Sequence, residues 1–295
     1  MSADTDLSTG VPPLGTHASL PTLLWRVVRV LVTVLTGALI LVVVSVGRRL
    51  GFGCDWLPSV VRWWHRRLCG ALGLRLNVSG RPATSALLVA NHISWLDIPV
   101  LGSQGPIGFL SKAEVRQWPL VGWMSAVAGT LFIARGASQT AEMGALIAER
   151  TRLGLPVVVF AEGTTGDGRA LRRFQPRLFA VAQQPGIRVQ PVAVRYGSNQ
   201  SPCTVAPFIG DDALVPHLFR VLRSPGIQVQ VSFLPLLDDG LGDRRALADA
   251  ARDAVAAALG VDPADYPTRP LHSLPLHSQP PTEADAVGWG GIHGV

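Results

Sequence analysis

The residues of this chain best suited to chemistry are His92 and Asp97, which follow the apolar run 86–90. An imidazole with an ordinary pKa of about 6.5 can accept a proton at neutral pH. We expect a helix to start near His92, which puts the Asp97 carboxylate a turn and a half along it. From there it can fold back, keep one ring nitrogen protonated and leave the other free as a general base. This pair is the base and the orienting acid of a catalytic triad without its serine. A purely structural histidine–carboxylate pair has the same spacing, so the spacing alone leaves both interpretations open.

The surrounding chain predicts the elements that position this pair. Two segments, 138–153 and 243–259, have helical composition with capping residues before them and a glycine after them. Short apolar runs bounded by Gly, Pro or polar residues are typical of strands. They lie at 74–78, 86–90, 107–111, 130–134, 156–161, 190–194 and 228–234. This alternation predicts an α/β fold with a mostly parallel central sheet flanked by helices, and His92 at a strand's carboxyl end.

An uncharged apolar segment at 30–47 precedes the predicted sheet and lies between arginines. It is slightly shorter than the about 20 residues that span a bilayer. Trp56, Trp63 and Trp64 follow it beside further arginines, a pattern typical of an interfacial helix. We therefore predict membrane-anchoring helices over 21–70, either spanning or half inserted, with a buried core helix as the alternative. The heavier positive charge after the segment predicts an inner-membrane protein whose remaining chain faces the cytoplasm.

The net charge of +6 is concentrated in residues 1–81, which contain nine arginines and three aspartates. This position favours an anionic membrane surface over nucleic acid, for which the sequence has no recognised binding motif. Residues 1–20 and 268–295 are rich in small and polar residues and in proline, and both are predicted to be disordered tails. A catalytic domain over 71–267 remains.

Cysteine and histidine usage gives no indication of a metal site. The three cysteines are scattered without a Cys-x-x-Cys pair, which argues against a disulfide framework and a structural zinc site. Three histidines in the predicted C-terminal tail are irregularly spaced. We therefore expect no metal and no redox cofactor.

Four ordered blocks of the chain resemble the lysophospholipid acyltransferase family, whose signature is Asn-His-x4-Asp. The resemblance covers about 74–235. The blocks are NHISWLDI (91–98), FLSKAEVRQWPLVGWMSAVAGTLFIARG (109–136), FAEGTTGDG (160–168) and QPVAVRY (190–196). In the second block, five residues occupy positions where the family keeps such residues, namely Lys112, Pro119, Gly122, Gly129 and Arg135.

The resemblance implies a direct acyl transfer. His92 would take the proton from the acceptor hydroxyl, and Asp97 would orient the imidazole and stabilise its charged form. The hydroxyl oxygen would then attack the thioester carbonyl of acyl-CoA or acyl carrier protein. Ser94 is an alternative nucleophile, but it lacks the Gly-x-Ser-x-Gly elbow of serine hydrolases.

The resemblance also implies an acceptor site. Glu162, Gly163 and Thr164 would bind the acceptor, while Arg135, assisted by Lys112, would contact its phosphate. Gly163 would let the backbone approach the ligand closely. A solvated loop carboxylate and a surface salt bridge are the alternatives for Glu162 and Arg135.

The third block departs from the family pattern at two positions. Thr165 stands where the family has an arginine that helps hold the phosphate, and a threonine cannot supply that bidentate fork. Ala161 stands where proline is common. The nearby basic residues Arg169, Arg172 and Arg173 could compensate; otherwise the acceptor carries no terminal phosphate.

The sequence thus predicts a membrane-bound acyltransferase of phospholipid biosynthesis that acylates the 2-hydroxyl of 1-acyl-glycerol-3-phosphate to form phosphatidate. The same chemistry on another lysolipid, such as lyso-ornithine lipid, is the alternative. The expected partners are the lysolipid, the acyl-CoA or acyl carrier protein donor, and membrane lipid. A non-catalytic lipid-binding membrane protein is a further alternative, against which the intact His92, Asp97 and Glu162 argue.

Overall fold

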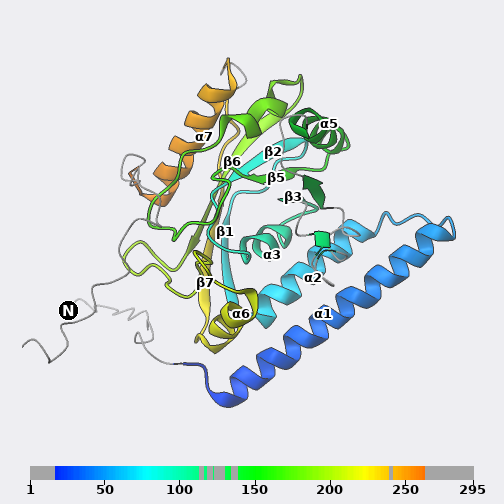
Figure 1. The fold of residues 1–295 in the computed structure, drawn as a ribbon, viewed down its shortest axis with the longest axis vertical. Coiled ribbons are helices and arrows are strands. Elements are labelled where there is room, and N and C mark those ends of the chain that lie inside the picture. Colours follow the sequence, from blue (N-terminus) through cyan, green and yellow to red (C-terminus); the bar gives the residue numbers. More distant parts are fainter. Residues whose placement is uncertain are drawn as a thin grey trace, which may run out of the picture. The chain divides into compact units, whose positions relative to one another are not determined.

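A computed structural model describes residues 17–112, 116–117, 122, 130–133, 139–238 and 242–262. Within this part of the chain, one sheet has seven strands in the order β1-β7-β6-β2-β5-β3-β4 (Figure 1). The strands are β1 (Leu74–Ser79), β2 (Ala86–Ala90), β3 (Gly108–Lys112), β4 (Leu131–Ile133), β5 (Val157–Phe160), β6 (Arg188–Tyr196) and β7 (Ile227–Phe233).

The described helices alternate with these strands, as the sequence predicts. The α-helices are α1 (Leu20–Arg49), α2 (Leu57–Ala71), α3 (Asp97–Gly102), α5 (Gln139–Arg152), α6 (Leu214–Arg223) and α7 (Arg244–Leu259), and a 3-10 helix, η2, covers Pro176–Gln183. Asp243 caps α7 by accepting from two backbone N–H groups, and Gly260 ends it with φ of 60°. The seven predicted strands and the predicted helices 138–153 and 243–259 agree with the structure to within two residues at each end.

The sheet is mostly parallel, which confirms the predicted fold class. Strands β2, β3, β4, β5 and β6 run parallel to one another. Strand β7 pairs antiparallel with β6, and β1 pairs parallel with β7, so these two run the opposite way. Short apolar runs do not encode strand direction, and this reversal is a feature that the sequence did not predict.

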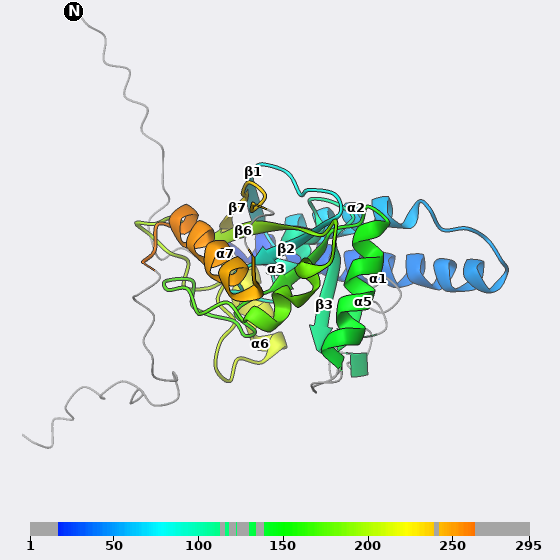
Figure 2. The same cartoon turned by 90° about the horizontal axis from the view of Figure 1, so that it is seen from above.

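Apolar layers cover both faces of the sheet, because every residue of β2 is buried and alternate side chains point to opposite faces. Leu88 packs in one layer and Leu87 in the other. The first layer includes residues of α1, α2, α3 and α6, while the second includes residues of α5, η2 and α7. Figure 1 shows α7 and α5 at the top, away from the long helix α1, and Figure 2 shows α7 at the left while α1 extends to the right.

Helix α1 is long and apolar enough to cross a membrane by length and composition. One stripe of it, which includes Val30, Leu41 and Val44, is buried against the protein, while the other side exposes many large apolar side chains. Figure 1 shows α2 lying beside α1. Trp64 of α2 is partly buried and donates its indole N–H to the Thr33 carbonyl at 2.7 Å, so it joins the two helices.

The predicted disordered tails lie almost wholly outside the described residues. The described part of the first one is hydrogen bonded, since the Ala18 N–H donates to the Arg223 carbonyl at 2.8 Å. Helix α1 begins at Leu20, with the Ser19 hydroxyl accepting from the Thr22 N–H. Residues 18–20 therefore take part in the start of α1 and in its contact with the end of α6.

Candidate functional site

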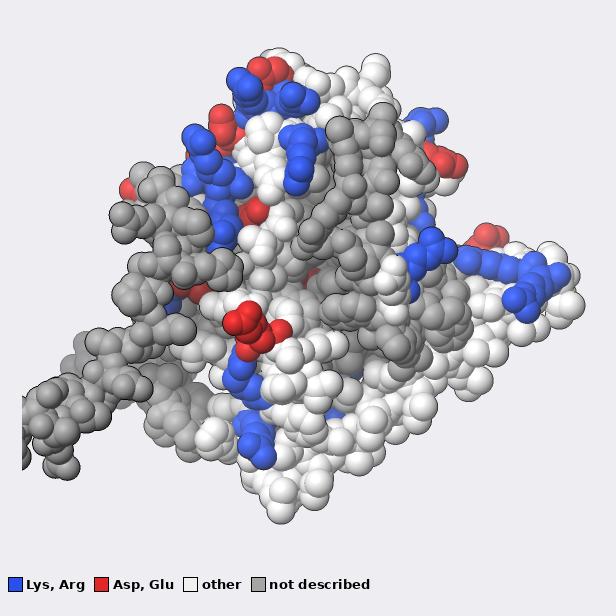
Figure 3. Space-filling view, in the orientation of Figure 1, with Lys and Arg blue, Asp and Glu red and all other residues white. Residues whose placement is uncertain are grey.

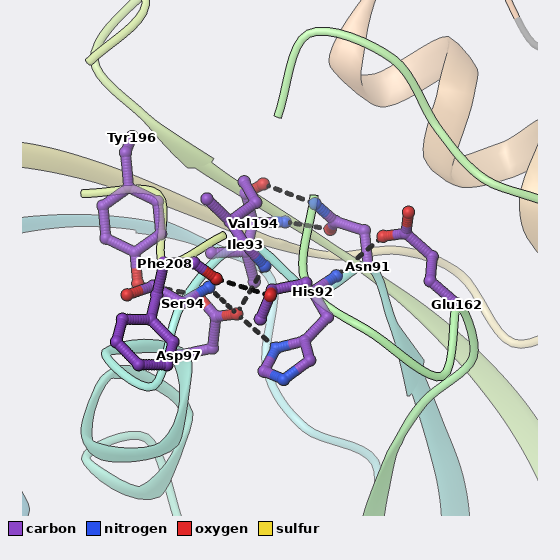
Figure 4. A network of polar contacts seen from close by, with 10 residues as sticks. Asn91, His92, Ile93, Ser94, Asp97, Glu162, Val194, Tyr196 and Phe208 are labelled. Atoms are coloured by element: carbon purple, nitrogen blue, oxygen red, sulfur yellow. Dashed lines mark hydrogen bonds and ion pairs between the residues drawn. The ribbon is translucent and has the colours of Figure 1, made fainter. Parts of the chain in front are cut away.

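The His92 and Asp97 side chains meet in the loop that follows β2 (Figure 4). The distance from His92 Nδ1 to Asp97 Oδ2 is 2.8 Å. The same oxygen accepts from the N–H groups of Ile93 and Ser94, at 2.8 and 3.0 Å. The buried carboxylate fixes Nδ1 as the protonated nitrogen, so Nε2 is the ring nitrogen that can accept a proton. The imidazole remains 19% exposed.

The local backbone around this pair differs from the sequence prediction. Asp97 was expected a turn and a half along a helix that starts near His92. Instead, residues 91–96 form a loop and Asp97 is the first residue of α3. The physical reason is that its carboxylate binds the N–H groups of Ile93 and Ser94, which closes the loop back onto the start of the helix.

Tyr196 holds the second oxygen of Asp97. Its hydroxyl, at the end of β6, donates to Asp97 Oδ1 at 2.7 Å. Burial, followed by the negative charge of Asp97, raises the pKa of Tyr196 well above its ordinary value, so the phenol stays a donor. Tyr196 ends the fourth block of the family resemblance, but that block gave no indication of this contact with Asp97.

Asn91 fastens the end of β2 to β6. Its side chain accepts from the Val194 N–H at 2.8 Å and donates to the Val194 carbonyl at 2.9 Å. Both groups are buried. This contact between β6 and the residue that follows β2 therefore also positions the neighbouring His92. The position of Asn91 in the Asn-His signature was the signal that could have identified its role.

Phe160 forms one side of the imidazole environment. It ends β5, and its ring stacks on His92 with 3.9 Å between ring centroids and 15° between planes. The register of the sheet explains this contact, because Phe160 pairs with Ala90, two residues before His92. An apolar ring against the base limits the access of water on that side.

Glu162 lies beneath the His92 loop with both carboxylate oxygens engaged. One accepts from the His92 N–H at 2.8 Å and the other from the Arg172 N–H at 3.0 Å. Burial raises the pKa of Glu162 to about 7, and the two N–H donors reduce the rise. These contacts position the loops; contact of Glu162 with the acceptor stays a prediction.

Gly163 and Thr164 are exposed next to this carboxylate, in a loop that continues past Thr165. Gly163 has φ of +73°, and a Cβ there would collide with the side-chain amide of Gln175. Glycine is therefore required by both backbone conformation and space. The binding role of Gly163 and Thr164 stays a prediction.

Two loops donate hydrogen bonds to the backbone of the loop that carries His92. The Gly166 N–H donates to the His92 carbonyl at 2.8 Å, and the Phe208 N–H donates to the Ile93 carbonyl at 3.0 Å. The Thr165 hydroxyl in turn donates to the Phe208 carbonyl. Thr165 therefore joins the loop after β5 to the loop after β6.

A buried histidine joins α6 to the signature loop. The Trp95 indole N–H donates to His217 Nδ1 at 3.0 Å, and His217 Nε2 lies 3.0 Å from the Pro207 carbonyl. These contacts fit a neutral ring with its proton on Nε2. Burial, followed by the charge of Arg220, lowers the pKa of His217. Sequence reasoning missed this residue because no pattern links it to Trp95.

The predicted phosphate contacts fall at the edge of the described chain. Lys112 is the last residue of β3. Arg135 lies outside the described residues, as do Pro119 and Gly129. Their predicted roles remain expectations. Among the residues described, no group of three or more His, Cys, Asp or Glu side chains is arranged to hold a metal ion.

Known proteins similar to this chain are acyltransferases. The family model described as Acyltransferase matches residues 75–195. The chain is 46% identical to the lyso-ornithine lipid O-acyltransferase of Pseudomonas aeruginosa over 80% of this chain and 93% of that protein. It is 33% identical to the 1-acyl-sn-glycerol-3-phosphate acyltransferase of Neisseria meningitidis serogroup B, over 67% of this chain and 79% of that one.

The fold also matches a solved structure, the 1-acyl-sn-glycerophosphate acyltransferase PlsC of Thermotoga maritima. The TM-score is 0.57 at 20% identity, over 80% of this chain and 96% of that one. The similarity of fold, the family match and the two relatives all agree with the resemblance found in the sequence. The chain belongs to the lysophospholipid acyltransferase family and is an acyltransferase that acts on lysolipids.

Proposed function

We propose that this enzyme transfers a fatty acyl group from a thioester donor to the hydroxyl of lyso-ornithine lipid. The observation that carries the choice of acceptor is Thr165, which stands where the family has a phosphate-binding arginine and whose hydroxyl is engaged by the Phe208 carbonyl. The 46% identity to a lyso-ornithine lipid O-acyltransferase supports it. Sequence reasoning placed 1-acyl-glycerol-3-phosphate first, and this identity supports placing lyso-ornithine lipid first instead.

Acylation of 1-acyl-glycerol-3-phosphate, which forms phosphatidate, is the second candidate. The 33% identity to the Neisseria enzyme favours it. The two candidates share their chemistry and differ in the head group of the acceptor, so only the acceptor-binding residues distinguish them.

In the proposed reaction, His92 Nε2 takes the proton of the acceptor hydroxyl while the oxygen attacks the thioester carbonyl. The carbon–sulfur bond breaks, and the thiolate leaves with the proton that the imidazolium returns. Asp97, buried beside Nδ1, stabilises the imidazolium during the transfer. General-base assistance of this kind contributes about 10²–10⁴ in rate. The donor is acyl-CoA or acyl carrier protein, and no cofactor takes part.

Steady-state kinetics with two acceptors tests this proposal. With a single acyl-CoA donor, kcat/KM for lyso-ornithine lipid should exceed that for 1-acyl-glycerol-3-phosphate at least tenfold. An equal preference, or a preference for the phosphate-bearing acceptor, would establish the second candidate instead.

We further propose that α1 is half inserted in the cytoplasmic leaflet of the inner membrane, with the active site on the cytoplasmic side. One stripe of α1 is buried against the protein, which leaves only its other side for lipid. That side exposes Leu31, Leu35 and Leu39 by 57%, 68% and 64%. A helix packed on the protein along one side presents only its other side to lipid, which suits a position along the interface.

Charges on this face test the membrane contact. The double variant Leu35→Arg, Leu39→Arg should reduce the fraction that pellets with phospholipid vesicles in high salt, while the folded domain is kept. The control is Val215→Arg at the second residue of α6, an apolar residue that is 60% exposed. Unchanged pelleting of the double variant would contradict the orientation.

A further inference from the structure

A small pocket lies next to the His92 loop and has not been used in the mechanism. Its volume is about 230 Å³, below the range of about 300–1,000 Å³ that drug-sized ligands occupy. It is formed by the loop after β5 and by the segment that leads from β6 into α6. Its charged side chains are Asp167, Arg169, Asp212 and Arg220. In Figure 3 acidic and basic side chains lie side by side over α6 and the preceding loop.

The pocket is adjacent to the catalytic base through its backbone. Asp167 follows Gly166, whose N–H donates to the His92 carbonyl at 2.8 Å. On the other wall, Phe208 stands between two pocket residues and donates to the Ile93 carbonyl at 3.0 Å. The two loops that hold the base in place are thus the two loops that enclose the pocket.

The charges of the pocket balance. Two aspartates and two arginines line it, so it carries no net charge. A phosphate monoester carries close to two negative charges near neutral pH and requires an excess of positive charge. A zwitterion requires one group of each sign. The balance therefore suits a zwitterion and gives a phosphate no advantage.

Two of these charges are fixed and two are available. Arg220 binds Asp212 through both oxygens, at 3.1 and 2.9 Å. Asp167 and Arg169 are exposed, and their one contact in the described chain joins the Arg169 N–H to Asp167 Oδ1 at 3.0 Å. The Arg169 guanidinium and the second oxygen of Asp167 have no partner among the described residues.

We propose that this pocket binds the zwitterionic amino-acid head group of the acceptor, with Arg169 contacting its carboxylate and Asp167 its ammonium. The proposal rests on the proposed function and assigns the acceptor-binding residues of that same site. Ornithine joined through its α-amine to a 3-hydroxyacyl chain keeps one carboxylate and one terminal ammonium. Its reacting hydroxyl oxygen is five bonds from the α-carbon, about 6 Å in an extended chain. With the head group in the pocket, this hydroxyl reaches toward His92.

The experiment pairs enzyme variants with acceptors that lack one charge. The acceptors are lyso-ornithine lipid, its methyl ester, which has no carboxylate, and its citrulline counterpart, which has no ammonium. The variants are Arg169→Gln and Asp167→Asn. The control, Arg188→Gln, removes an exposed guanidinium at the first residue of β6, at the opposite end of that strand from Tyr196.

For wild type and the control, kcat/KM should fall about tenfold on either neutralised acceptor, mainly through KM. Relative to wild type, Arg169→Gln should lose about tenfold in kcat/KM on lyso-ornithine lipid. On the methyl ester, its kcat/KM should equal that of wild type. Asp167→Asn should show the same pattern with the citrulline acceptor. These non-additive losses support direct contacts.

Two other outcomes overturn the proposal and separate it from the proposed function. If wild type prefers lyso-ornithine lipid but both variants keep KM within twofold, the pocket assignment is wrong and the proposed function stands. If wild type uses 1-acyl-glycerol-3-phosphate and not lyso-ornithine lipid, the proposed function fails and the pocket assignment fails with it.

Discussion

The Tyr196 hydroxyl donates to Asp97 Oδ1 at 2.7 Å, so the carboxylate that binds the His92 imidazole is itself held by a residue at the end of β6. Asp97 Oδ2 binds the His92 imidazole and two backbone N–H groups. Every described contact of this buried carboxylate comes from a donor. These donors fix the orientation of the carboxylate, and its hydrogen bond with Nδ1 fixes the orientation of the imidazole.

Tyr196→Phe should therefore lower both stability and turnover. A hydrogen bond to a buried charge contributes about 1.5–3 kcal/mol, so the unfolding free energy should fall by about that amount. The kcat should fall about tenfold with little change in KM, because Asp97 gains freedom while the acceptor site stays intact. Chemical denaturation and steady-state kinetics measure the two effects. A kcat within twofold of wild type would show that Asp97 is positioned without Tyr196.

Because burial raises the pKa of Glu162, the free energy of unfolding should depend on pH. The folded pKa of Glu162, about 7, lies above its ordinary value of 4.5, so the folded state holds a proton that the unfolded state releases. This contribution is fully present below about pH 4.5 and is lost as the pH rises through about 7, with a slope of up to about 1.4 kcal/mol per pH unit. Glu162→Gln should lack this slope.

Melting temperatures of the detergent-solubilised protein between pH 5 and pH 8 check this prediction. Glu149→Gln on α5 is the matched control, because Glu149 is exposed and should leave the wild-type slope unchanged. If Glu162→Gln shows the wild-type slope, another group carries the dependence.

Thr165→Arg should shift acceptor preference toward phosphate. The change restores the bidentate fork that the family uses, and a charge-assisted contact of about 1.5–3 kcal/mol corresponds to one to two powers of ten in binding. The ratio of kcat/KM for 1-acyl-glycerol-3-phosphate to that for lyso-ornithine lipid should rise at least tenfold. Thr165→Val, which removes only the hydroxyl bound to the Phe208 carbonyl, is the control and should leave the ratio unchanged. A ratio that stays constant in Thr165→Arg would mean that position 165 does not face the head group.

Arg26 joins the apolar helix to the domain. Its buried guanidinium donates to the Leu222 and Ser224 carbonyls at the end of α6. Arg26→Met should leave these carbonyls unpaired at about 1–3 kcal/mol each and lower the melting temperature. Arg29→Met, at an exposed position of the same helix, should leave it unchanged. Equal melting temperatures for the two variants would contradict the anchoring role of Arg26.

Sequence reasoning found the strands and the His92–Asp97 pair because both are local. Apolar runs fix strand positions, and a spacing of five residues is visible in the sequence. It missed the contacts of Asn91 with Val194 and of Tyr196 with Asp97, which join residues about a hundred positions apart. These contacts exist because β2 pairs with β6 in one register, and no short pattern specifies that pairing.

Glu162 illustrates a second limit. The family resemblance predicts that it binds the acceptor, and this stays a prediction. It did not predict that the Glu162 oxygens accept from the His92 and Arg172 N–H groups. A motif names the residue but not the direction in which its side chain points. Likewise, nothing in the sequence placed Asp167 and Arg169 in one pocket with Asp212 and Arg220, because the two pairs come from separate loops.

The role of His92 as general base is tested most directly by the turnover of the His92→Ala variant on lyso-ornithine lipid. The melting temperature of the variant is measured in parallel. The imidazole is partly exposed, and the Asp97 carboxylate keeps its three other donors, so the variant should remain folded. If His92 is the general base, kcat should fall by about 10²–10⁴ while the acceptor still binds. A folded His92→Ala protein with a kcat within twofold of wild type would contradict the central claim that His92 is the general base.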